Sequence, residues 1–200
     1  MRFVDFYYDF RSPFAYFAAH RIRTGAFSLP ADVAWRWHPV SIGALINFQA
    51  GRQPFEAFAD PLAPPKRAHF MADVVRNAQF YRVPIRPPNP QRPDTAPALY
   101  IAARTGDEAF RDAVFDAMWL QQRDIGDTSV LRDCAKMAGI DARVVDEAMA
   151  DGARDTVAAT AHQTYDAGVF GVPTFVFDGE VFFGNDRLDM LGWRVALKAG

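Results

Sequence analysis

The sequence predicts an α/β fold in which a large α-helical insertion interrupts a small framework of strands and helices. Three observations predict this fold. A strand–helix–strand pattern spans residues 2–38, helical spacing of apolar residues recurs between residues 66 and 150, and a helix, a β-hairpin and a last helix follow. With 200 residues, half of them apolar, the chain is long enough to bury a core.

A short aromatic stretch specifies the first strand and helix. Residues 2–8 are rich in aromatic and β-branched side chains, as buried strands tend to be. Ser12 is a favoured N-cap residue, and Pro13 suits the first helical position, so we expect a helix from Pro13 to about Thr24. The period-two alternation of residues 33–38 predicts a second strand.

The middle of the chain is predicted to be helical. Residues 54–97 hold ten of the fourteen prolines, and the four between Arg86 and Pro93 favour an extended loop. Around this loop, the spacing of apolar residues predicts five helices, over residues 66–81, 96–105, 107–123, 128–138 and 141–150.

The last fifty residues predict a long helix, a hairpin and a final helix. The long helix covers residues 152–167, and the final one residues 187–198. Between them, Asp178-Gly179 favours a tight turn that joins strands over residues 174–177 and 180–183. Without the insertion, this order is that of thioredoxin. We therefore expect a thioredoxin-like fold with a large α-helical insertion: a thioredoxin-like domain of residues 1–41 and 151–200, and an α-helical insertion domain of residues 42–150.

Composition excludes several function classes. A net charge of −2 gives no basic surface for nucleic acid, so no nucleic-acid partner is expected. The single cysteine, Cys134, excludes an intramolecular disulfide, and the four histidines show no metal-ligand spacing, so no metal is expected. No signal peptide or membrane-spanning apolar run is visible. We therefore expect a cytoplasmic protein with no membrane partner.

The candidate site begins at Ser12. A helix N-terminus presents unpaired N–H groups and the positive end of the helix dipole, which favour an anion. In thioredoxin-type folds this position holds the catalytic cysteine. Here Ser12 and Ala15 stand where the two cysteines would be, which argues against a disulfide oxidoreductase. Taken alone, Ser12-Pro13 is more simply explained as a helix cap.

Two later motifs are candidates for the rest of the site. Val172-Pro173 opens a strand; in thioredoxin-type folds this proline is cis, and the preceding residue offers backbone groups to an extended peptide. The sequence alone does not reveal the isomer. The second motif, residues 184–187, either caps the last helix or binds the charged groups of a ligand.

The three motifs together resemble the 2-hydroxychromene-2-carboxylate isomerase family, which is related to kappa-class glutathione transferases and DsbA-like proteins. They are Tyr8-Asp9-Phe10-Arg11-Ser12-Pro13-Phe14, Gly168-Val169-Phe170-Gly171-Val172-Pro173-Thr174-Phe175 and Phe183-Gly184-Asn185-Asp186-Arg187. The resemblance implies glutathione as cofactor and a homodimer. It also implies that Ser12 contacts the glutathione sulfur, that Val172 pairs with its backbone, and that other residues complete the cofactor site, namely Pro13, Pro173, Gly184, Asn185, Asp186 and Arg187.

The substrate half of the site departs from the family pattern. Asn47 stands where family members with isomerase activity tend to carry lysine, and Asp94 stands where asparagine is commoner. We expect a small aromatic substrate to contact Asn47, Phe48, Lys66 and Asp94. The cations considered for its carboxylate are Lys66, Arg76 and Arg86, and the aromatic residues considered for its ring are Phe14, Phe48, Phe55 and Trp119.

The resulting hypothesis is a glutathione-dependent isomerase of a conjugated aromatic carboxylate such as 2-hydroxychromene-2-carboxylate. Ser12 would stabilise the glutathione thiolate, which adds to a double bond, allows rotation and leaves. Two alternatives stay open at this point. One is a kappa-type glutathione transferase, in which the thiolate remains on the product. The other is a non-catalytic thioredoxin-like binding module that uses Val172-Pro173.

Overall fold

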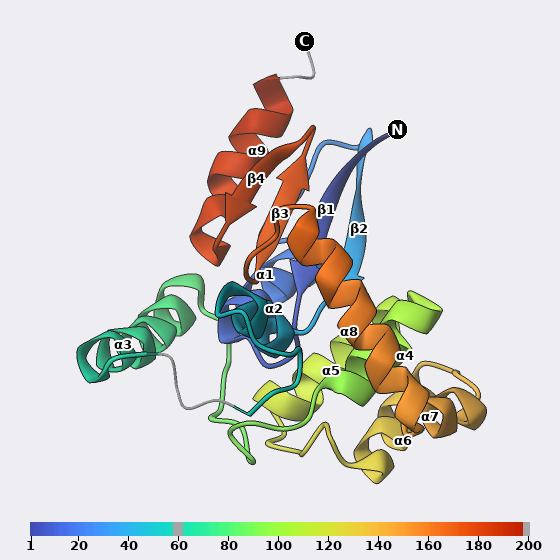
Figure 1. The fold of residues 1–200 in the computed structure, drawn as a ribbon. Helices are drawn as coiled ribbons and strands as arrows, with labels where there is room; N and C mark the ends of the chain where they lie inside the picture. The colour runs from blue at the N-terminus through green and yellow to red at the C-terminus, as the bar shows by residue number, and fades with distance from the viewer. Residues whose placement is uncertain (58–61, 198–200) are drawn as a thin grey trace.

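The structure, a computed structural model, describes residues 1–57 and 62–197, and these contain one four-stranded mixed sheet (Figure 1). The strands lie in the order β2-β1-β3-β4. They are β1 (Arg2–Tyr8), β2 (Val33–Pro39), β3 (Thr174–Phe177) and β4 (Glu180–Phe183). β1 is parallel to β2 and antiparallel to β3, and β3 is antiparallel to β4. This is the predicted α/β fold with a helical insertion.

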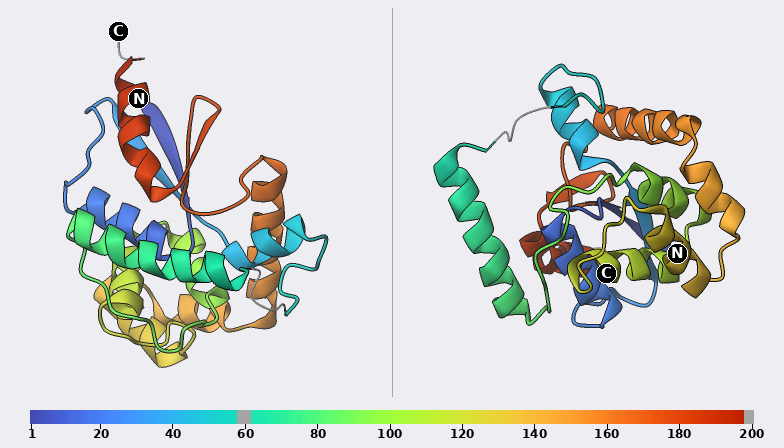
Figure 2. Two further views of the ribbon diagram at one scale, coloured as in Figure 1. Left: turned by 90° about the vertical axis from the view of Figure 1, so that its left-hand side faces the viewer. Right: turned by 90° about the horizontal axis from the view of Figure 1, so that it is seen from below.

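Helices cover both faces of the sheet (Figures 1 and 2). α1 (Pro13–Arg23) and α9 (Leu188–Leu197) lie on one face, and α2 (Ile42–Gln49) and α8 (Asp151–Asp166) lie on the other. A 3₁₀ turn, η1 (Asn185–Arg187), leads into α9. The predicted end of the last helix, Lys198, lies outside the described residues.

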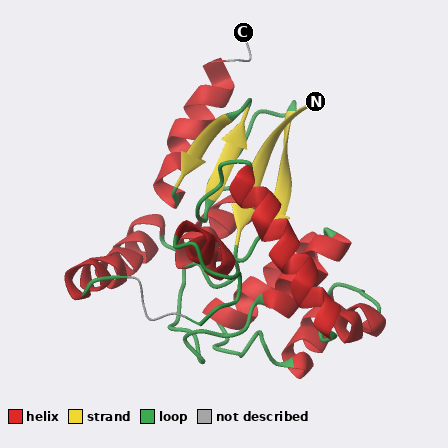
Figure 3. Cartoon of the chain, viewed as in Figure 1, coloured by secondary structure: helices red, strands yellow, loops and turns green. Residues whose placement is uncertain are grey.

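The remaining helices belong to the insertion. They are α3 (Pro64–Tyr81), α4 (Ala96–Thr105), α5 (Glu108–Trp119), α6 (Thr128–Met137) and α7 (Ala142–Ala148). α4 to α7 pack together below the sheet, whereas α3 projects to one side, as the cartoon in Figure 3 also shows. Asp127 and Asp141 cap α6 and α7 by accepting backbone hydrogen bonds. The helix starts predicted at residues 128 and 141 therefore lie within one residue of the observed ones.

Aromatic side chains fill the centre of the core. Alternate residues of β1, namely Val4, Phe6 and Tyr8, are buried, because successive strand residues point to opposite faces. The ring of Phe6 lies 4.6 Å from both Trp37 and Phe175, measured between centroids. Burial of each such side chain contributes about 1.5–3 kcal/mol. These contacts join β1, β2 and β3 into one layer.

Two elements differ from the prediction. The helix expected over residues 107–123 ends at Trp119, because the chain turns at Gln122, which has a positive φ of 57°. α2 was not predicted at all. Its segment is apolar except for Asn47 and Gln49 and contains Gly43, so helical periodicity is hard to see in it. Ser41 nevertheless caps it by accepting from the Ala44 N–H at 3.2 Å.

The strand register brings the three sequence motifs to one edge of the sheet. Tyr7 lies opposite Thr174, and Thr174 lies opposite Phe183. β1 and β4 run in the same direction and β3 runs the other way. The residues that follow β1 and β4 and those that precede β3 therefore lie at the same edge. The residues gathered there include Ser12, Val172, Pro173 and Gly184.

Candidate functional site

Ser12 is the N-cap of α1, as the sequence predicts. Its Oγ accepts a hydrogen bond from the Ala15 N–H at 3.2 Å, and the residue is 8% exposed. This bond uses an oxygen lone pair and leaves the hydroxyl proton to be donated. In addition, no group of the described residues accepts from the Phe14 N–H. The start of α1 therefore offers an O–H and an N–H donor to an anion.

Asp9 fixes the turn that carries Ser12. Its buried carboxylate accepts from the Arg11 N–H at 2.9 Å and from the Ile42 N–H at 2.8 Å. Burial raises the pKa of Asp9, and the Arg11 charge and these N–H groups oppose that rise. Asp9 was not predicted to have a role. An aspartate often forms a turn by accepting a hydrogen bond from the backbone N–H two residues later, so this signal was present in the sequence.

Backbone groups of Val172 and Pro173 lie at the same edge of the sheet. The Val172–Pro173 peptide is cis in this structure. The Pro173 carbonyl accepts from the Gly184 N–H at 2.9 Å. The N–H and C=O of Val172 have no hydrogen-bond partner within residues 1–57 and 62–197. Unpaired backbone groups of this kind are the ones with which an extended peptide forms hydrogen bonds.

The segment from Gly184 to Arg187 serves two purposes. Asn185 is buried: its side-chain N–H donates to Asn77 Oδ1 at 3.2 Å, and its carbonyl accepts from Arg21 at 3.2 Å. Asp186 and Arg187 are exposed, 3.6 Å apart. Asn185 therefore holds the segment against α1 and α3, while its two neighbours face solvent.

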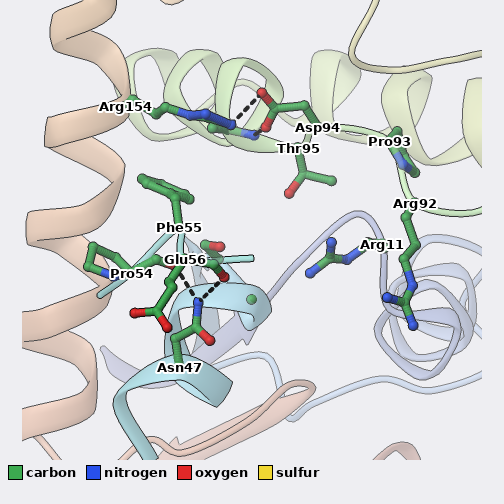
Figure 4. Close-up of a pocket in the computed structure, with 13 residues that line it drawn as sticks. Arg11, Asn47, Pro54, Phe55, Glu56, Arg92, Pro93, Asp94, Thr95 and Arg154 are labelled. Atoms are coloured by element: carbon green, nitrogen blue, oxygen red, sulfur yellow. Dashed lines mark hydrogen bonds and ion pairs between the residues drawn. The ribbon is translucent and has the colours of Figure 1, made fainter. Parts of the chain in front are cut away.

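A pocket of about 270 Å³ opens beside this edge (Figure 4). Its wall is formed by the turn that precedes α1, by α2 and the loop that follows it, by the segment before α4, and by α8. The lining residues are Arg11, Ser41, Gly43, Asn47, Pro54, Phe55, Glu56, Arg92, Pro93, Asp94, Thr95, Ala96 and Arg154. Of the residues predicted to contact substrate, the pocket thus brings together Asn47 and Asp94.

The other predicted substrate residues lie elsewhere. Phe48 packs against His162 and Tyr165 of α8, with ring centroids 5.2 Å and 5.8 Å away. Lys66 is exposed at the start of α3. None of the remaining candidates Arg76, Arg86, Phe14 and Trp119 lines the pocket, whereas Phe55 does.

Internal contacts hold Asn47 and Asp94 in the pocket wall. Asn47 is 1% exposed; its Nδ2 donates to the carbonyls of Pro54 at 3.2 Å and Glu56 at 2.9 Å, and its Oδ1 accepts from Arg52 at 3.0 Å. Asp94 forms an ion pair with Arg154 at 2.7 Å. Each residue therefore joins two separate segments around the cavity.

Sequence reasoning missed Arg11 and Arg154 as pocket residues. Arg11 directly precedes Ser12 and could have been considered for that reason. Arg154 carries no local signal, because its partner Asp94 is 60 positions away. Within the described ranges, no cluster of metal-ligating side chains occurs, and no helix has the length and apolar character of a membrane span.

Comparison with known proteins agrees with this geometry. The family model of the DSBA-like thioredoxin domain matches residues 3–196. The 2-hydroxychromene-2-carboxylate isomerase of Sphingobium xenophagum is 33% identical over 191 residues, which cover 94% of this chain and 95% of that protein.

Solved structures show the same fold. A structure of 2-hydroxychromene-2-carboxylate isomerase has a TM-score of 0.78 at 23% identity, covering 98% of this chain and 96% of the other. The cytosolic disulfide reductase DsbM from Pseudomonas aeruginosa, solved with GSH, has a TM-score of 0.61 at 20% identity, covering 98% of each chain. The chain therefore belongs to the DSBA-like thioredoxin-domain family and, within it, to the relatives of 2-hydroxychromene-2-carboxylate isomerase.

Proposed function

We propose that this protein is a glutathione-dependent isomerase of a conjugated aromatic carboxylate such as 2-hydroxychromene-2-carboxylate. The observation that carries the proposal is the Ser12 hydroxyl, which is oriented by Ala15 and keeps its proton free at the start of α1. The name of the 33% identical relative supports the reaction and substrate. The structural neighbour solved with GSH supports the cofactor.

The residues at the sheet edge fit glutathione. The unpaired N–H and C=O of Val172 suit a peptide backbone. The exposed carboxylate of Asp186 suits the ammonium of a γ-glutamyl group, and Arg187 suits its carboxylate. Gly184 has a φ of 114°, and a Cβ at this position would lie only 2.5 Å from the Asp186 carboxylate. A side chain at position 184 would therefore displace the carboxylate that suits the ammonium.

Bound glutathione would supply a thiolate able to add reversibly to an electron-poor double bond. Ser12 stabilises negative charge by donating its hydroxyl proton, a contribution of about 1.5–3 kcal/mol for a charged acceptor. The N-terminus of α1 adds about 0.3–1 kcal/mol. Ser12 has no histidine base within hydrogen-bonding distance among the described residues, so its role is to donate rather than to attack.

The protein's own thiol does not provide an alternative nucleophile. Cys134 lies on α6 and is buried in the core. Burial raises the pKa of its thiol to about 11, so very little of it is ionised at neutral pH.

An ultraviolet titration of bound glutathione tests the proposal directly. Thiolate absorbance is followed against pH for the wild type, for Ser12→Ala and for Thr160→Ala. Thr160 is a control outside the pocket, because its hydroxyl on α8 donates to the Thr156 carbonyl at 3.0 Å. We expect the bound thiol pKa to lie well below that of free glutathione, to rise in Ser12→Ala, and to stay low in Thr160→Ala.

Product analysis then identifies the reaction. The wild type is incubated with 2-hydroxychromene-2-carboxylate, with and without glutathione. Isomerised product with glutathione unconsumed supports the proposal. A product that retains glutathione would indicate a kappa-type transferase instead. Binding without a shift in thiol pKa would contradict both and leave a non-catalytic binding module.

A further inference from the structure

The pocket beside Ser12 contains a charged side chain that has no hydrogen-bond or ion-pair partner among the described residues. Arg11 is half-buried, and Figure 4 shows its guanidinium pointing into the space between Asn47 and Thr95. No residue within 1–57 and 62–197 forms an ion pair or hydrogen bond with this guanidinium. A guanidinium presents paired N–H donors that match the two oxygens of a carboxylate.

The other charges around the pocket favour an anion or are already engaged. Arg92, which is itself engaged in an interaction, adds a second guanidinium to the wall. Arg154 is paired with Asp94 at 2.7 Å, and the Glu56 carboxylate accepts from the Gln53 N–H at 3.2 Å. Among the described lining residues there are three arginines and two carboxylates, and both carboxylates have partners.

Local structure fixes the position of Arg11 relative to Ser12. The two residues are adjacent, and Asp9 holds the Arg11 backbone N–H at 2.9 Å. Gly43 leaves room for the side chain, because a Cβ there would lie 3.0 Å from Arg11 Nη2. Phe55 provides an aromatic surface in the same wall and packs 4.7 Å from Arg154.

We propose that Arg11 is the specificity-determining residue of this site and binds the carboxylate of the substrate. This inference rests on the proposed function and adds to it the residue that recognises the carboxylate, so that neutral analogues of the substrate are rejected. A neutral ligand would leave the buried part of the guanidinium without a charged acceptor. The affinity for that ligand is lower, because a buried donor without its acceptor costs free energy.

Equilibrium binding of two matched probes tests the assignment without any reaction. The probes are 2-naphthoate and its neutral amide, 2-naphthamide, titrated by calorimetry into wild type, Arg11→Gln and Arg11→Lys. We expect the wild type to prefer the carboxylate by about ten- to a hundredfold, the range for a charge-assisted hydrogen bond. Arg11→Gln should bind both probes equally, and Arg11→Lys should keep a reduced preference.

An exposed arginine provides the control. Arg143 lies on α7, pairs with Asp141 at 3.5 Å and is 86% exposed, so Arg143→Gln should retain the full preference. Thermal unfolding checks that each variant is folded. The Arg11 backbone N–H that Asp9 accepts is kept by every substitution, and Arg11→Lys also keeps the positive charge near Asp9.

The outcomes separate this inference from the proposed function. Equal binding of both probes by the wild type, or an unchanged preference in folded Arg11→Gln, would overturn the role of Arg11 even if isomerisation is observed. A preference that depends on Arg11, found in a protein that does not isomerise 2-hydroxychromene-2-carboxylate, would uphold the carboxylate site and remove the proposed reaction. If Arg11→Gln loses the preference for the carboxylate probe and isomerises the substrate with a raised KM and a similar kcat, both the role of Arg11 and the proposed function are supported.

Discussion

The carboxylate of Asp9 accepts a hydrogen bond from the backbone N–H of Ile42 at 2.8 Å, which joins the turn before α1 to the first residue of α2. The same carboxylate holds the Arg11 N–H at 2.9 Å. Ser12 belongs to the turn, and Asn47 belongs to α2. The turn that carries Ser12 and the pocket wall that carries Asn47 are therefore held together by one buried carboxylate, that of Asp9.

Replacing Asp9 by asparagine should weaken this connection. Asparagine has one acceptor oxygen, so either the Arg11 N–H or the Ile42 N–H would face an amide N–H₂ group in a buried place. We expect a loss of about 1–3 kcal/mol in the free energy of unfolding. Urea unfolding measures this change. In the control, Asp127→Asn, stability should be nearly unchanged, because Asp127 caps α6 at an exposed site and asparagine is an equally good cap.

Removing the side chain of Asn47 should release one wall of the pocket. Asn47→Ala leaves the carbonyls of Pro54 and Glu56 without their buried donor and Arg52 without one acceptor. The expected cost is about 1–3 kcal/mol, with weaker binding of 2-naphthoate. Gln49→Ala is the matched amide deletion on the exposed face of α2 and should cost less. Equal losses from the two substitutions would show that Asn47 does not support the wall.

The glycine at position 184 should be far less replaceable than the one at position 179. Both have positive φ, 114° and 77°. A Cβ on Gly179 meets nothing within 4 Å, whereas a Cβ on Gly184 would lie 2.5 Å from Asp186 Oδ1. Gly184→Ala should therefore displace Asp186, cost about 1–3 kcal/mol and weaken glutathione binding. Calorimetric titration of glutathione compares the two variants, and similar affinities would contradict this prediction.

The parts of the fold that depend on adjacent residues were predictable from the sequence. Ser12-Pro13 located the start of α1, and Asp178-Gly179 located the hairpin turn, where φ is 52° and 77°. Each of these signals arises from the conformational preference of one or two residues. Agreement among several of them was enough to predict the element order, and the order predicted the fold.

The pocket depended on pairings that no local pattern encodes. Asp94 meets Arg154 across 60 positions, and Asp9 meets Ile42 across 33. The side-chain direction of Arg11 also follows from the placement of α2, which was not predicted. Sequence reasoning therefore assigned the carboxylate contact to exposed residues such as Lys66, which does not line the pocket.

The charge cluster at Asp5 should make stability fall in acid. Burial of Asp5 opposes its ionisation, but hydrogen bonds from Arg36 and His38 outweigh burial and hold the pKa of Asp5 below its usual value of 3.8. An acid whose pKa is lower in the folded state contributes stability that is present above its unfolded pKa. That contribution is lost as the pH falls through the folded pKa.

Asp5→Asn should therefore lower stability near neutral pH by about 1 kcal/mol or less, because Arg36 is largely exposed and the pair is partly screened. As the pH falls below 3.8 and through the lower folded-state pKa of Asp5, wild type and variant should converge, since the wild-type carboxyl becomes protonated as well. Urea unfolding at several pH values between these limits measures the difference. A double-mutant cycle with Arg36→Gln isolates the ion pair, and a difference that stays constant down to the acid limit would show that Asp5 acts through its shape rather than its charge.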